Sequence, residues 1–356
     1  MSHLLRRFAK GIIANLLWNL GEYRKALHGL KAPMILKYHR VSLEARSAKA
    51  ARDYTDFERG HYASVLEAHA QLLLRYRRPI SMDELVEALA LGKSLPERAV
   101  AVTFDDGYED TYNIAAPILK RYGIPATVYV CPGLIDSGSG FWWDHVVRYF
   151  RHTQHRDFVL TNVLEGAKVD VKAALPRLYL RNIKTKHLAA ERVIKIFKGM
   201  PESKLPQLMK CLLEELGLSQ GKIPTSNHAL LSWSQIREMS EDGMDIGSHT
   251  MTHPMLSHLT EHQIREEFAN ANQRIFEVVR QPVRGLVYPS GDYNESCGRI
   301  AMECGLRYAC TSNPGFVTPA SETYFLKRIE LPNAGIAISV RDILLTWRYV
   351  QSNSLN

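Results

Sequence analysis

Residues Ala99–Phe104 form an unbroken apolar run, rich in β-branched side chains, that leads directly into Asp105, Asp106 and Gly107. A run of this kind, with no polar break, is typical of a strand buried on both faces of a parallel sheet or barrel. Gly107 stands where such a strand must turn sharply, so both aspartates are predicted to lie at its carboxyl end. Folds that alternate strands and helices carry their chemistry at that end.

The two aspartates can have different roles. On an extended backbone, adjacent side chains point to opposite sides, so one carboxylate can bind a metal while the other transfers protons. Taken alone, the same residues are equally typical of an Asp-Asp-Gly turn whose carboxylates cap a helix. The interpretation therefore depends on what the rest of the chain supplies.

A second segment, Ser248–Pro254, contains His249 and His253 four positions apart. If these residues lie on a helical turn, their rings share one face and converge on one ion. An isolated pair of this spacing is more often two exposed histidines in a loop. Combined with Asp105 and Asp106, the histidines complete a facial set of one carboxylate and two imidazoles, with a second carboxylate available as a base.

Helix and strand signals alternate through much of the chain. Ala126–Val130 is a clear strand candidate and Arg307–Thr311 a weaker one. Capping boxes predict helix starts at three places, and their first residues are Ser81, Ser232 and Thr260. This alternation predicts an α/β fold whose parallel sheet is closed, or nearly closed, into a barrel.

Three motifs in the right order make the chain similar to the polysaccharide deacetylases, the NodB-type enzymes of carbohydrate esterase family 4. Thr103–Gly107 resembles the first motif of that family, and Leu231–Pro254 resembles the second with its lead-in helix and strand. Val287–Asn294 resembles the third, the Pro-x-Gly wall of the substrate groove. The resemblance covers roughly residues 33–135 and 229–330, and it implies a distorted (β/α) barrel of the polysaccharide deacetylase type.

The resemblance implies a role for each motif residue. Asp106, His249 and His253 would hold a divalent metal, usually Zn²⁺, with Co²⁺, Ni²⁺, Fe²⁺ and Mn²⁺ as alternatives. Asp105 would be the general base that takes a proton from water, and the resulting hydroxide would attack an N-acetyl carbonyl. The metal and the backbone N–H of Ser290 would then stabilise the tetrahedral oxyanion.

The expected oxyanion and substrate wall consists of Tyr288, Pro289, Ser290 and Gly291. Two departures from the usual family pattern are visible nearby. The position that usually holds a base-orienting arginine is Val287. The late Leu-x-His motif that supplies the general acid is absent, because no histidine follows His262. Base orientation and the acid must therefore come from elsewhere in the chain.

His39 is the candidate for the missing acid. Met34–Val41 looks like a first strand ending in Tyr38 and His39, as in the exopolysaccharide-modifying branch of the family, where an early histidine occupies the acid position. An imidazole also titrates near the working pH of most enzymes. The alternative is a histidine that makes a local hydrogen bond at the strand end. Tyr38 is a candidate substrate contact.

The aromatic segment Phe141–Asp144 resembles the same branch. Trp142 and Trp143 suit the apolar faces of pyranose rings, but paired tryptophans are as often core or interface anchors. Asp144 can either bond sugar hydroxyls or orient a catalytic residue. All three remain candidate substrate contacts.

The chain has 356 residues, enough for one barrel with additions. We expect an N-terminal basic amphipathic helix in residues 1–30, a NodB-type deacetylase domain in 31–345 and a tail in 346–356. A helical insertion at about 144–223 interrupts the domain, and Leu205–Leu216 in it has an apolar stripe at helical spacing. The insertion is interpreted as a lid or groove wall, although a solvated helix face is the usual meaning of its charge pattern.

His3–Leu20 combines an apolar face with a basic one and is too short to span a bilayer. Such helices lie on anionic membranes in some proteins and pack on their own domain in others; the net charge of +8 favours membrane contact. No small-residue cleavage site follows. Five cysteines without disulfide or zinc spacing predict reduced thiols. We therefore expect a cytoplasmic protein, peripheral at the inner face of the membrane.

The leading functional hypothesis is a metal-dependent deacetylase that removes the N-acetyl group of an amino sugar. Its expected partners are an N-acetylated glycan or a lipid-linked amino sugar of envelope or exopolysaccharide synthesis. An O-acetyl esterase or a sugar deformylase would use the same site, and a glycan-binding relic without activity would share the fold. Nucleic acid is not expected as a partner, because the chain has no phosphate loop, zinc finger or aromatic-basic RNA motif.

Overall fold

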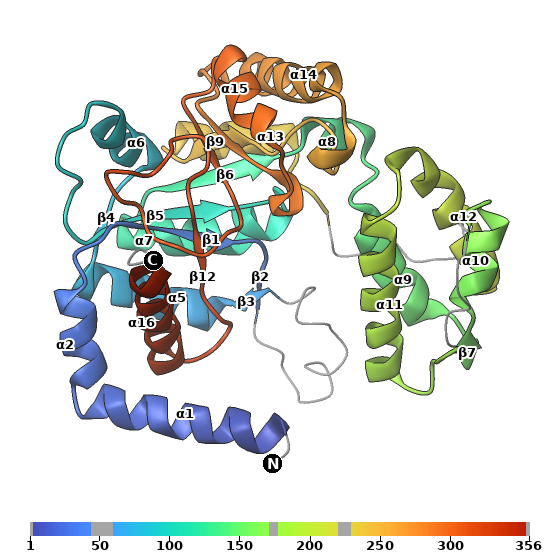
Figure 1. Cartoon of the computed structure of the whole chain (residues 1–356), viewed down its shortest axis with the longest axis horizontal. Helices are drawn as coiled ribbons and strands as arrows, with labels where there is room; N and C mark the ends of the chain where they lie inside the picture. The colour runs from blue at the N-terminus through green and yellow to red at the C-terminus, as the bar shows by residue number, and fades with distance from the viewer. Residues whose placement is uncertain (1–2, 44–59, 171–176, 220–228, 354–356) are drawn as a thin grey trace. The chain divides into compact units, whose positions relative to one another are not determined.

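The computed structural model describes residues 3–43, 60–170, 177–219 and 229–353. These residues form two compact units. The first unit contains the described residues up to Gly133 and again from Leu231 to the end, and the second contains those from Leu134 to Leu230. Figure 1 shows the chain with its elements labelled.

A parallel sheet of eight strands is the centre of the first unit, and it curves into a half-barrel. The strand order is β11-β10-β9-β6-β5-β1-β12, with β4 also pairing with β5. The strands are β1 (Met34–Tyr38), β4 (Arg78–Pro79), β5 (Ala99–Phe104), β6 (Ala126–Val130), β9 (Asp245–Ser248), β10 (Gly285–Val287), β11 (Tyr308–Cys310) and β12 (Ile329–Glu330). A parallel bridge between Cys310 and Leu326 links β11 to the segment that enters β12, so the two edges of the sheet approach each other. The predicted (β/α) barrel fold is confirmed.

The strands form where the apolar runs predicted them. Every residue of β1, β5 and β6 is buried, as expected for strands covered on both faces. Within β5, Val102 pairs with Leu36 on one side and with Ala126 on the other. This register places the end of β5, and hence Asp105 and Asp106, at the same edge of the sheet as the ends of β1 and β9.

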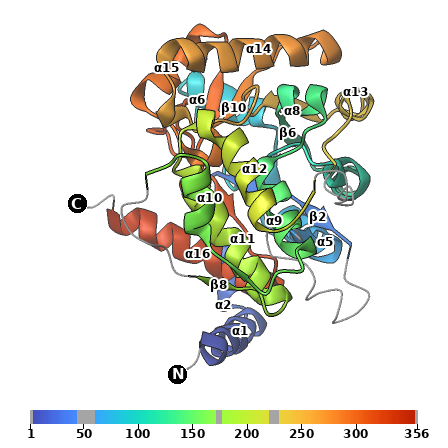
Figure 2. The ribbon, with the colours of Figure 1, turned by 90° about the vertical axis from the view of Figure 1, so that its right-hand side faces the viewer.

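Helices surround the sheet in the order typical of alternating folds. They are α5 (Ala63–Tyr76), α6 (Met82–Ala90), α7 (Ala116–Tyr122), α13 (Trp233–Glu241), α14 (Glu261–Val279) and α15 (Glu295–Glu303). Another helix, α8 (Pro132–Ser137), contains the boundary between the two units. A π-helical turn, Thr111–Ala115, precedes α7, and short 3₁₀ turns occupy Leu256–His258 and Pro289–Gly291. The capping boxes expected at Ser232 and Thr260 are both formed, and Ser81 caps α6. In both views α14 and α15 lie side by side (Figure 2).

The terminal helices pack together in the first unit. They are α1 (His3–Asn19), α2 (Glu22–Gly29) and α16 (Ile336–Asn353), and each contacts the other two. A small parallel pair, β2 (Val41–Ser42) with β3 (His61–Tyr62), lies outside the main sheet. None of the helices within the described ranges is both long and apolar enough to cross a membrane.

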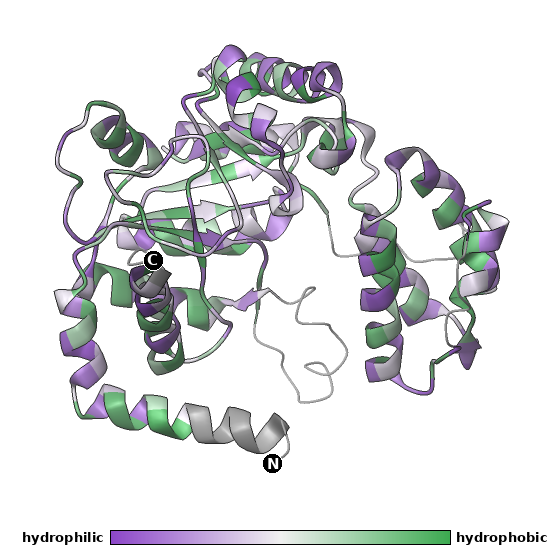
Figure 3. Ribbon diagram, in the orientation of Figure 1, coloured by the Kyte–Doolittle hydropathy of each residue, from purple (hydrophilic) through white to green (hydrophobic). Residues whose placement is uncertain are grey.

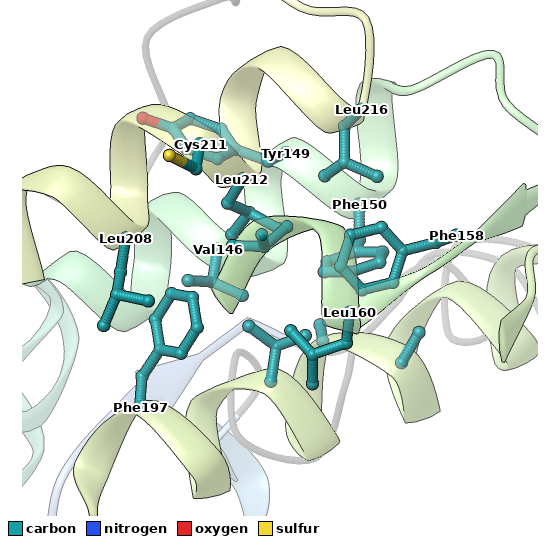
Figure 4. Packing of buried hydrophobic residues seen from close by; sticks show 14 of the residues in the cluster. Val146, Tyr149, Phe150, Phe158, Leu160, Phe197, Leu208, Cys211, Leu212 and Leu216 are labelled. Carbon is teal, nitrogen blue, oxygen red and sulfur yellow. The ribbon is translucent and has the colours of Figure 1, made fainter. Parts of the chain in front are cut away.

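The second unit has its own hydrophobic core. Its elements are α9 (Trp142–His152), β7 (Asp157–Phe158), α10 (Leu160–Gly166), β8 (Leu178–Tyr179), α11 (Ile183–Lys198), a 3₁₀ turn (Glu202–Lys204) and α12 (Leu205–Glu215). Figure 4 shows Phe150 of α9, Phe197 of α11 and Leu212 of α12 pointing into this core. The apolar stripe that predicted a helix from Leu205 is the buried face of α12.

Candidate metal centre and active site

The turn after β5 fixes both aspartates at the carboxyl edge of the sheet. Asp106 has a positive φ of 74° and Gly107 one of 67°. A β-carbon on Gly107 would lie 2.9 Å from Cγ1 of Val130, so a larger residue would collide with β6. The N–H of Asp105 still continues the ladder, because it donates to the carbonyl of Tyr38 at 2.9 Å. Glycine is therefore required where the sequence placed the sharp turn.

Asp106, His249 and His253 come together at this edge. One ligand atom from each residue lies within 4.8 Å of the other two. Oδ1 of Asp106 is 3.4 Å from Nε2 of His249 and 3.7 Å from Nε2 of His253. Asp106 and His249 are 4% and 2% exposed, so few water molecules compete for these donors. The two aspartates have separate environments, and the left-handed backbone at Asp106 separates them, not the alternation of an extended chain.

A hydrogen bond prepares His249 for metal binding. Its Nδ1 lies 2.7 Å from the carbonyl oxygen of Val287. A carbonyl can only accept, so Nδ1 carries the proton and Nε2 keeps its lone pair for a ligand bond. Nitrogen and carboxylate donors in this number are the set that divalent zinc and its neighbours prefer. The residues present therefore fit a divalent metal ion.

The two histidines do not lie on a helical turn, so that prediction is wrong. The segment after β9 is irregular, and Thr250 and His253 have positive φ values of 65° and 62°. The rings meet edge to face with centroids 4.7 Å apart, because the loop folds back on itself. Side-chain anchors are needed to hold such a backbone, since non-glycine residues adopt positive φ only at a cost in energy.

Glu267 of α14 is the main anchor of this loop, and no sequence signal pointed to it. Its Oε2 accepts from the backbone N–H of Met251 at 2.8 Å and of Thr252 at 2.9 Å. Its Oε1 accepts from the hydroxyl of Thr252 at 2.7 Å. One carboxylate thus holds two successive peptide groups between the candidate metal ligands His249 and His253. Bonds of this kind, from N–H to an ionised acceptor, are stronger than neutral ones.

We expect Glu267→Ala to weaken metal affinity by about 10- to 100-fold, as is typical when a residue that supports the ligands is removed. Glu267→Gln, which keeps one acceptor oxygen, should lose less. The measurement is competition for Zn²⁺ against a coloured chelator. Glu266→Ala is the matched control, because Glu266 is exposed and forms an ion pair with His262 on the surface of the same helix. Equal affinity for Zn²⁺ in the wild type and in Glu267→Ala would show that the loop keeps its conformation without Glu267.

Arg328 clamps Asp105 and is the second residue that sequence reasoning missed. Its Nη1 and Nη2 donate to Oδ1 and Oδ2 of Asp105, each at 2.7 Å. Nη1 also donates to Oγ1 of Thr103 at 3.1 Å, and Nε donates to the carbonyl of Thr311 at 2.9 Å. Arg328 is 1% exposed. It holds the predicted base in place, which Val287 cannot do.

The clamp also sets the charge of Asp105. Burial by itself would raise the pKa of this carboxyl, but the charge and hydrogen bonds of Arg328 outweigh burial and hold the pKa well below its usual range. Burial would likewise raise the pKa of Asp106, and the hydrogen bond and charges of the histidines lower it instead. Both carboxylates are therefore ionised at neutral pH.

His39 follows β1 and reaches the same edge. Its Nε2 lies 3.8 Å from Oδ2 of Asp105, and its side chain is 35% exposed. Lys37, which precedes it on the same side of the strand, pairs with Glu330 at 2.8 Å. The structure thus brings His39 beside the predicted base, where a half-exposed imidazole can meet a substrate.

Tyr38 faces the other side of the strand, because neighbouring side chains alternate. It is 1% exposed, and its hydroxyl lies 3.1 Å from Nδ1 of His69. Nε2 of His69 in turn lies 2.8 Å from the hydroxyl of Ser339, and burial lowers the pKa of His69 to about 3. The structure contradicts a substrate contact by the Tyr38 side chain, since that side chain belongs to a buried network.

The residues that are predicted to form the wall after β10 make a tight turn. Ser290 has a φ of 55° and Gly291 one of 70°. A β-carbon on Gly291 would lie 2.7 Å from Cβ of Ser312, so the turn packs closely on the neighbouring loop. Tyr288 is fully buried and donates its hydroxyl to the carbonyl of Tyr324 at 2.9 Å. Tyr288 therefore supports the wall from within, and Pro289 is also buried.

The aromatic segment belongs to the second unit. Trp143 is 5% exposed and stacks on Phe141 with ring centroids 4.4 Å apart, while Trp142 packs against the core of that unit. Asp144 is also buried. These contacts show the tryptophans as packing residues of their own unit. A role in substrate binding for Trp142, Trp143 and Asp144 stays a prediction.

Comparison with known proteins agrees with the site. The sequence profile of the polysaccharide deacetylase family matches residues 92–156 and 192–309. A poly-β-1,6-N-acetyl-D-glucosamine N-deacetylase of Escherichia coli is 35% identical over 126 residues, which is 35% of this chain and 17% of that protein. YxkH of Bacillus subtilis, a candidate polysaccharide deacetylase, is 24% identical over 243 residues, 68% of this chain and 55% of YxkH. The chain thus spans about half the length of YxkH and a smaller part of the Escherichia coli enzyme.

Solved structures share the fold. The deacetylase PplD of Streptococcus pyogenes, solved in complex with acetate, aligns with a TM-score of 0.56 at 20% identity, covering 89% of this chain and 97% of PplD. At this sequence identity, the structural similarity shows only that the two proteins share a fold. The family profile, however, includes both segments that supply Asp105, Asp106 and the two histidines. The chain belongs to the polysaccharide deacetylase family.

Proposed function

We propose that this protein is a metal-dependent N-deacetylase acting on an amino sugar in a polysaccharide or a lipid-linked glycan. The observation that carries the proposal is the pairing of two carboxylates in one turn. One of them lies among two histidines, and the other is held by a buried arginine. The Escherichia coli relative is a poly-β-1,6-N-acetyl-D-glucosamine N-deacetylase, which supports the same substrate class.

Asp106, His249 and His253 are the residues that would hold the metal, and Zn²⁺ is the ion we propose. When bound there, a divalent ion supplies Lewis acidity and lowers the pKa of water. Everything else in the reaction depends on side chains and backbone groups that the chain itself provides.

Asp105 would accept the proton of the attacking water. Arg328 donates a hydrogen bond to one lone pair on each carboxylate oxygen of Asp105. Each oxygen therefore keeps a second lone pair that can accept the proton. The clamp makes the carboxylate a weaker base, but it keeps Asp105 ionised and fixed in position, which is what proton transfer at a set distance requires. His39, whose Nε2 lies 3.8 Å from Oδ2 of Asp105, would donate a proton to the amine nitrogen as its bond to the acetyl carbon breaks. We assign the backbone N–H of Ser290 as a donor to the oxyanion.

The test is a matched set of sugars that differ only in the group removed. Zinc-loaded protein is incubated with N-acetyl, N-formyl and O-acetyl forms of one oligosaccharide, and mass spectrometry follows the loss of each group. We expect the N-acetyl form to lose its acetyl group fastest. Faster loss of formyl or O-acetyl would reassign the activity, and tight binding with no loss of any group would indicate a glycan-binding protein.

We also propose that α1 contacts an anionic membrane surface, in a cytoplasmic protein that works on membrane-attached glycan. Four large apolar residues near the end of this helix are more than half exposed: Ile12, Ile13, Leu16 and Leu20. At 3.6 residues per turn they lie within an arc of about 100°. Ala14, on the opposite side, is fully buried. Figure 3 shows the hydrophobic character of this part of α1.

The charge of α1 favours a lipid surface over a neutral apolar partner. Between His3 and Asn19 the sequence contains Arg6, Arg7 and Lys10 and no acidic residue. A helical segment whose sequence combines basic and apolar residues without acidic ones is typical of segments that bind anionic headgroups. All five cysteines are free, which supports a location in a reducing compartment. The proposed membrane surface would face that compartment.

Exchanging Ile12 and Leu16 for serine should reduce binding to anionic vesicles by more than tenfold, since each buried aliphatic side chain is worth about 1.5–3 kcal/mol. Cosedimentation with phosphatidylglycerol vesicles measures this effect. Leu91→Ser is the control, because Leu91 is 57% exposed on a different helix end. Equal binding of the wild type to neutral and anionic vesicles would contradict the proposal. A wild-type dimer that dissociates in the double variant would contradict it too.

A further inference from the structure

His39 lies on a short connection between two strands. β1 ends at Tyr38 and β2 begins at Val41, so His39 and Arg40 are the only residues of this connection. The side chain of His39 is 35% exposed, with its Nε2 3.8 Å from Oδ2 of Asp105. The place of this imidazole therefore depends on what holds the residues that follow it.

Asp110 holds those residues with both oxygens of its carboxylate. Its Oδ1 accepts from the backbone N–H of Val41 at 3.1 Å, and its Oδ2 accepts from Nε of Arg40 at 3.0 Å. The side chains of Arg40 and Asp110 are 8% and 15% exposed, so water competes little for these bonds. Hydrogen bonds to an ionised carboxylate are stronger than neutral ones. The two residues after His39 are thus fixed to the segment that follows Asp106.

Arg40 is held by other contacts as well. Its guanidinium lies over the ring of the buried Tyr108, 4.4 Å from the ring centroid. Its carbonyl accepts from the backbone N–H of His61 at 2.9 Å. A β-carbon on Gly60 would collide with that carbonyl group, so the backbone before β3 packs directly on Arg40. The connection that carries His39 is therefore surrounded by contacts that leave its backbone little freedom.

One short segment carries both the predicted base and this anchor. Asp105, Asp106, Tyr108 and Asp110 lie within six consecutive residues, directly before the π-helical turn. A movement of the segment would therefore shift the base and the connection of His39 together. Proton transfer needs its donor at a set distance from the reacting atoms, and a misplacement of about 1 Å can cost 10²-fold in rate.

We infer that Asp110, together with Arg40, is a positioning residue that sets the place of the His39 imidazole beside Asp105. The inference rests on the proposed function, because it takes His39 as the acid that protonates the leaving amine. In this role Asp110 acts through the backbone that follows His39 and needs no contact with the substrate. Its loss should impair departure of the amine and spare the attack of water on the carbonyl.

The test compares two leaving groups in Asp110→Asn, which keeps the size of the side chain but has only one acceptor oxygen. For zinc-loaded protein, kcat with an N-acetylated glucosamine oligomer should fall by about 10- to 100-fold, with KM little changed. With 4-nitrophenyl acetate the rate should fall by no more than about twofold, because nitrophenolate leaves without a proton. An equal loss with both substrates would indicate a general defect of the fold and would overturn the inference.

Arg40→Lys guards against a variant that fails to fold. Lysine keeps the charge beside Asp110 but loses the planar group that lies over Tyr108. The loss should show the same preference for the amide and should be smaller than in Asp110→Asn. A loss confined to the ester, or shared equally by both substrates, would contradict a role in positioning the acid.

A double variant shows whether Asp110 acts through His39. In His39→Ala there is no imidazole to position, so adding Asp110→Asn should lower kcat by no more than about twofold. A full further loss would refute the inference. Glu97→Gln is the matched control and should keep wild-type kinetics. Glu97 is exposed and pairs with Lys31 at 2.9 Å, between the segments that enter β5 and β1 at their opposite ends.

Nuclear magnetic resonance of protein with ¹⁵N-labelled histidine gives a readout that needs no turnover. The ring signals of His39, identified by their loss in His39→Ala, should shift or broaden in Asp110→Asn and stay in place in Glu97→Gln. If the wild type releases acetate but these signals and the preference between substrates do not change in Asp110→Asn, the positioning role is refuted while the proposed function stands. If the wild type releases no acetate and the signals move, the positioning of the imidazole stands and the proposed function is refuted.

Discussion

Replacing Asp105 with asparagine is expected to lower kcat for acetate release by about 10²- to 10⁴-fold. Asparagine keeps the shape of the side chain and one acceptor for Arg328, but it cannot take a proton from water. Asp106, His249 and His253 are untouched, so affinity for Zn²⁺ should stay within a few-fold of the wild type. Steady-state kinetics together with a chelator competition measure both quantities.

Asp242→Asn is the matched control for this change. Asp242 is an exposed residue that pairs with Lys120 and lies away from the strand ends that carry the site. Its variant should keep wild-type kcat. If Asp105→Asn retained most of the activity with zinc bound, a different group would have to be the base, and the two-carboxylate account would be wrong.

Replacing Arg328 with methionine should destabilise the fold by about 3–5 kcal/mol, because it leaves Asp105 as an unpaired buried charge. In the wild type the pKa of Asp105 is lowered by Arg328, so this pair contributes stability above the unfolded pKa of the carboxyl and loses it as pH falls. In the variant burial raises that pKa instead. The loss of stability of the variant relative to the wild type should therefore become smaller as pH falls from neutral to mildly acidic. Denaturant unfolding of both proteins at the two pH values measures this loss.

Combining Arg328→Met with Asp105→Asn separates charge from packing. Removal of both partners eliminates the unpaired charge, so the double variant should be more stable than Arg328→Met alone. Arg307→Met serves as the control, since Arg307 is exposed. A double variant as unstable as the single one would show that Arg328 matters for its bonds to Thr103 and Thr311 and not for the charge of Asp105.

The parts of the site that the sequence predicted have local signals. Ala99–Phe104 is apolar throughout, and any strand with that pattern must end where Asp105 and Gly107 begin. His249 was predicted with its motif for the same reason, since a short strand and a glycine precede it. The half-barrel fold follows from repeated strands and helix caps along the chain, which are likewise local features.

The parts that could not be predicted depend on distant segments. Arg328 lies 223 positions from Asp105, and only the pairing of β12 with β1 brings it to the base. An arginine directly before a two-residue strand was the available signal, and without the topology it had no identifiable partner. Glu267 likewise looked like one more polar residue of a helix. It contacts the loop of His253 because α14 packs against β9.

Strand alternation explains the error at Tyr38. The motif Tyr-His marked the right strand end, but only one of two successive side chains can face the site. His39 does so, and Tyr38 enters the network with His69. The expected helical turn at His249 failed because Thr250 adopts a positive φ, which no propensity of threonine predicts.

Acetate release before and after metal removal is the most direct test of a metal-dependent deacetylase. Protein stripped by a chelator and then dialysed should release no acetate from N-acetylated glucosamine oligomers, and one equivalent of Zn²⁺ should restore the rate. The same addition to His253→Ala should restore little, because one of the three ligands is missing. Undiminished release from stripped wild-type protein, or full rescue of His253→Ala by one equivalent, would contradict the role assigned to Asp106, His249 and His253.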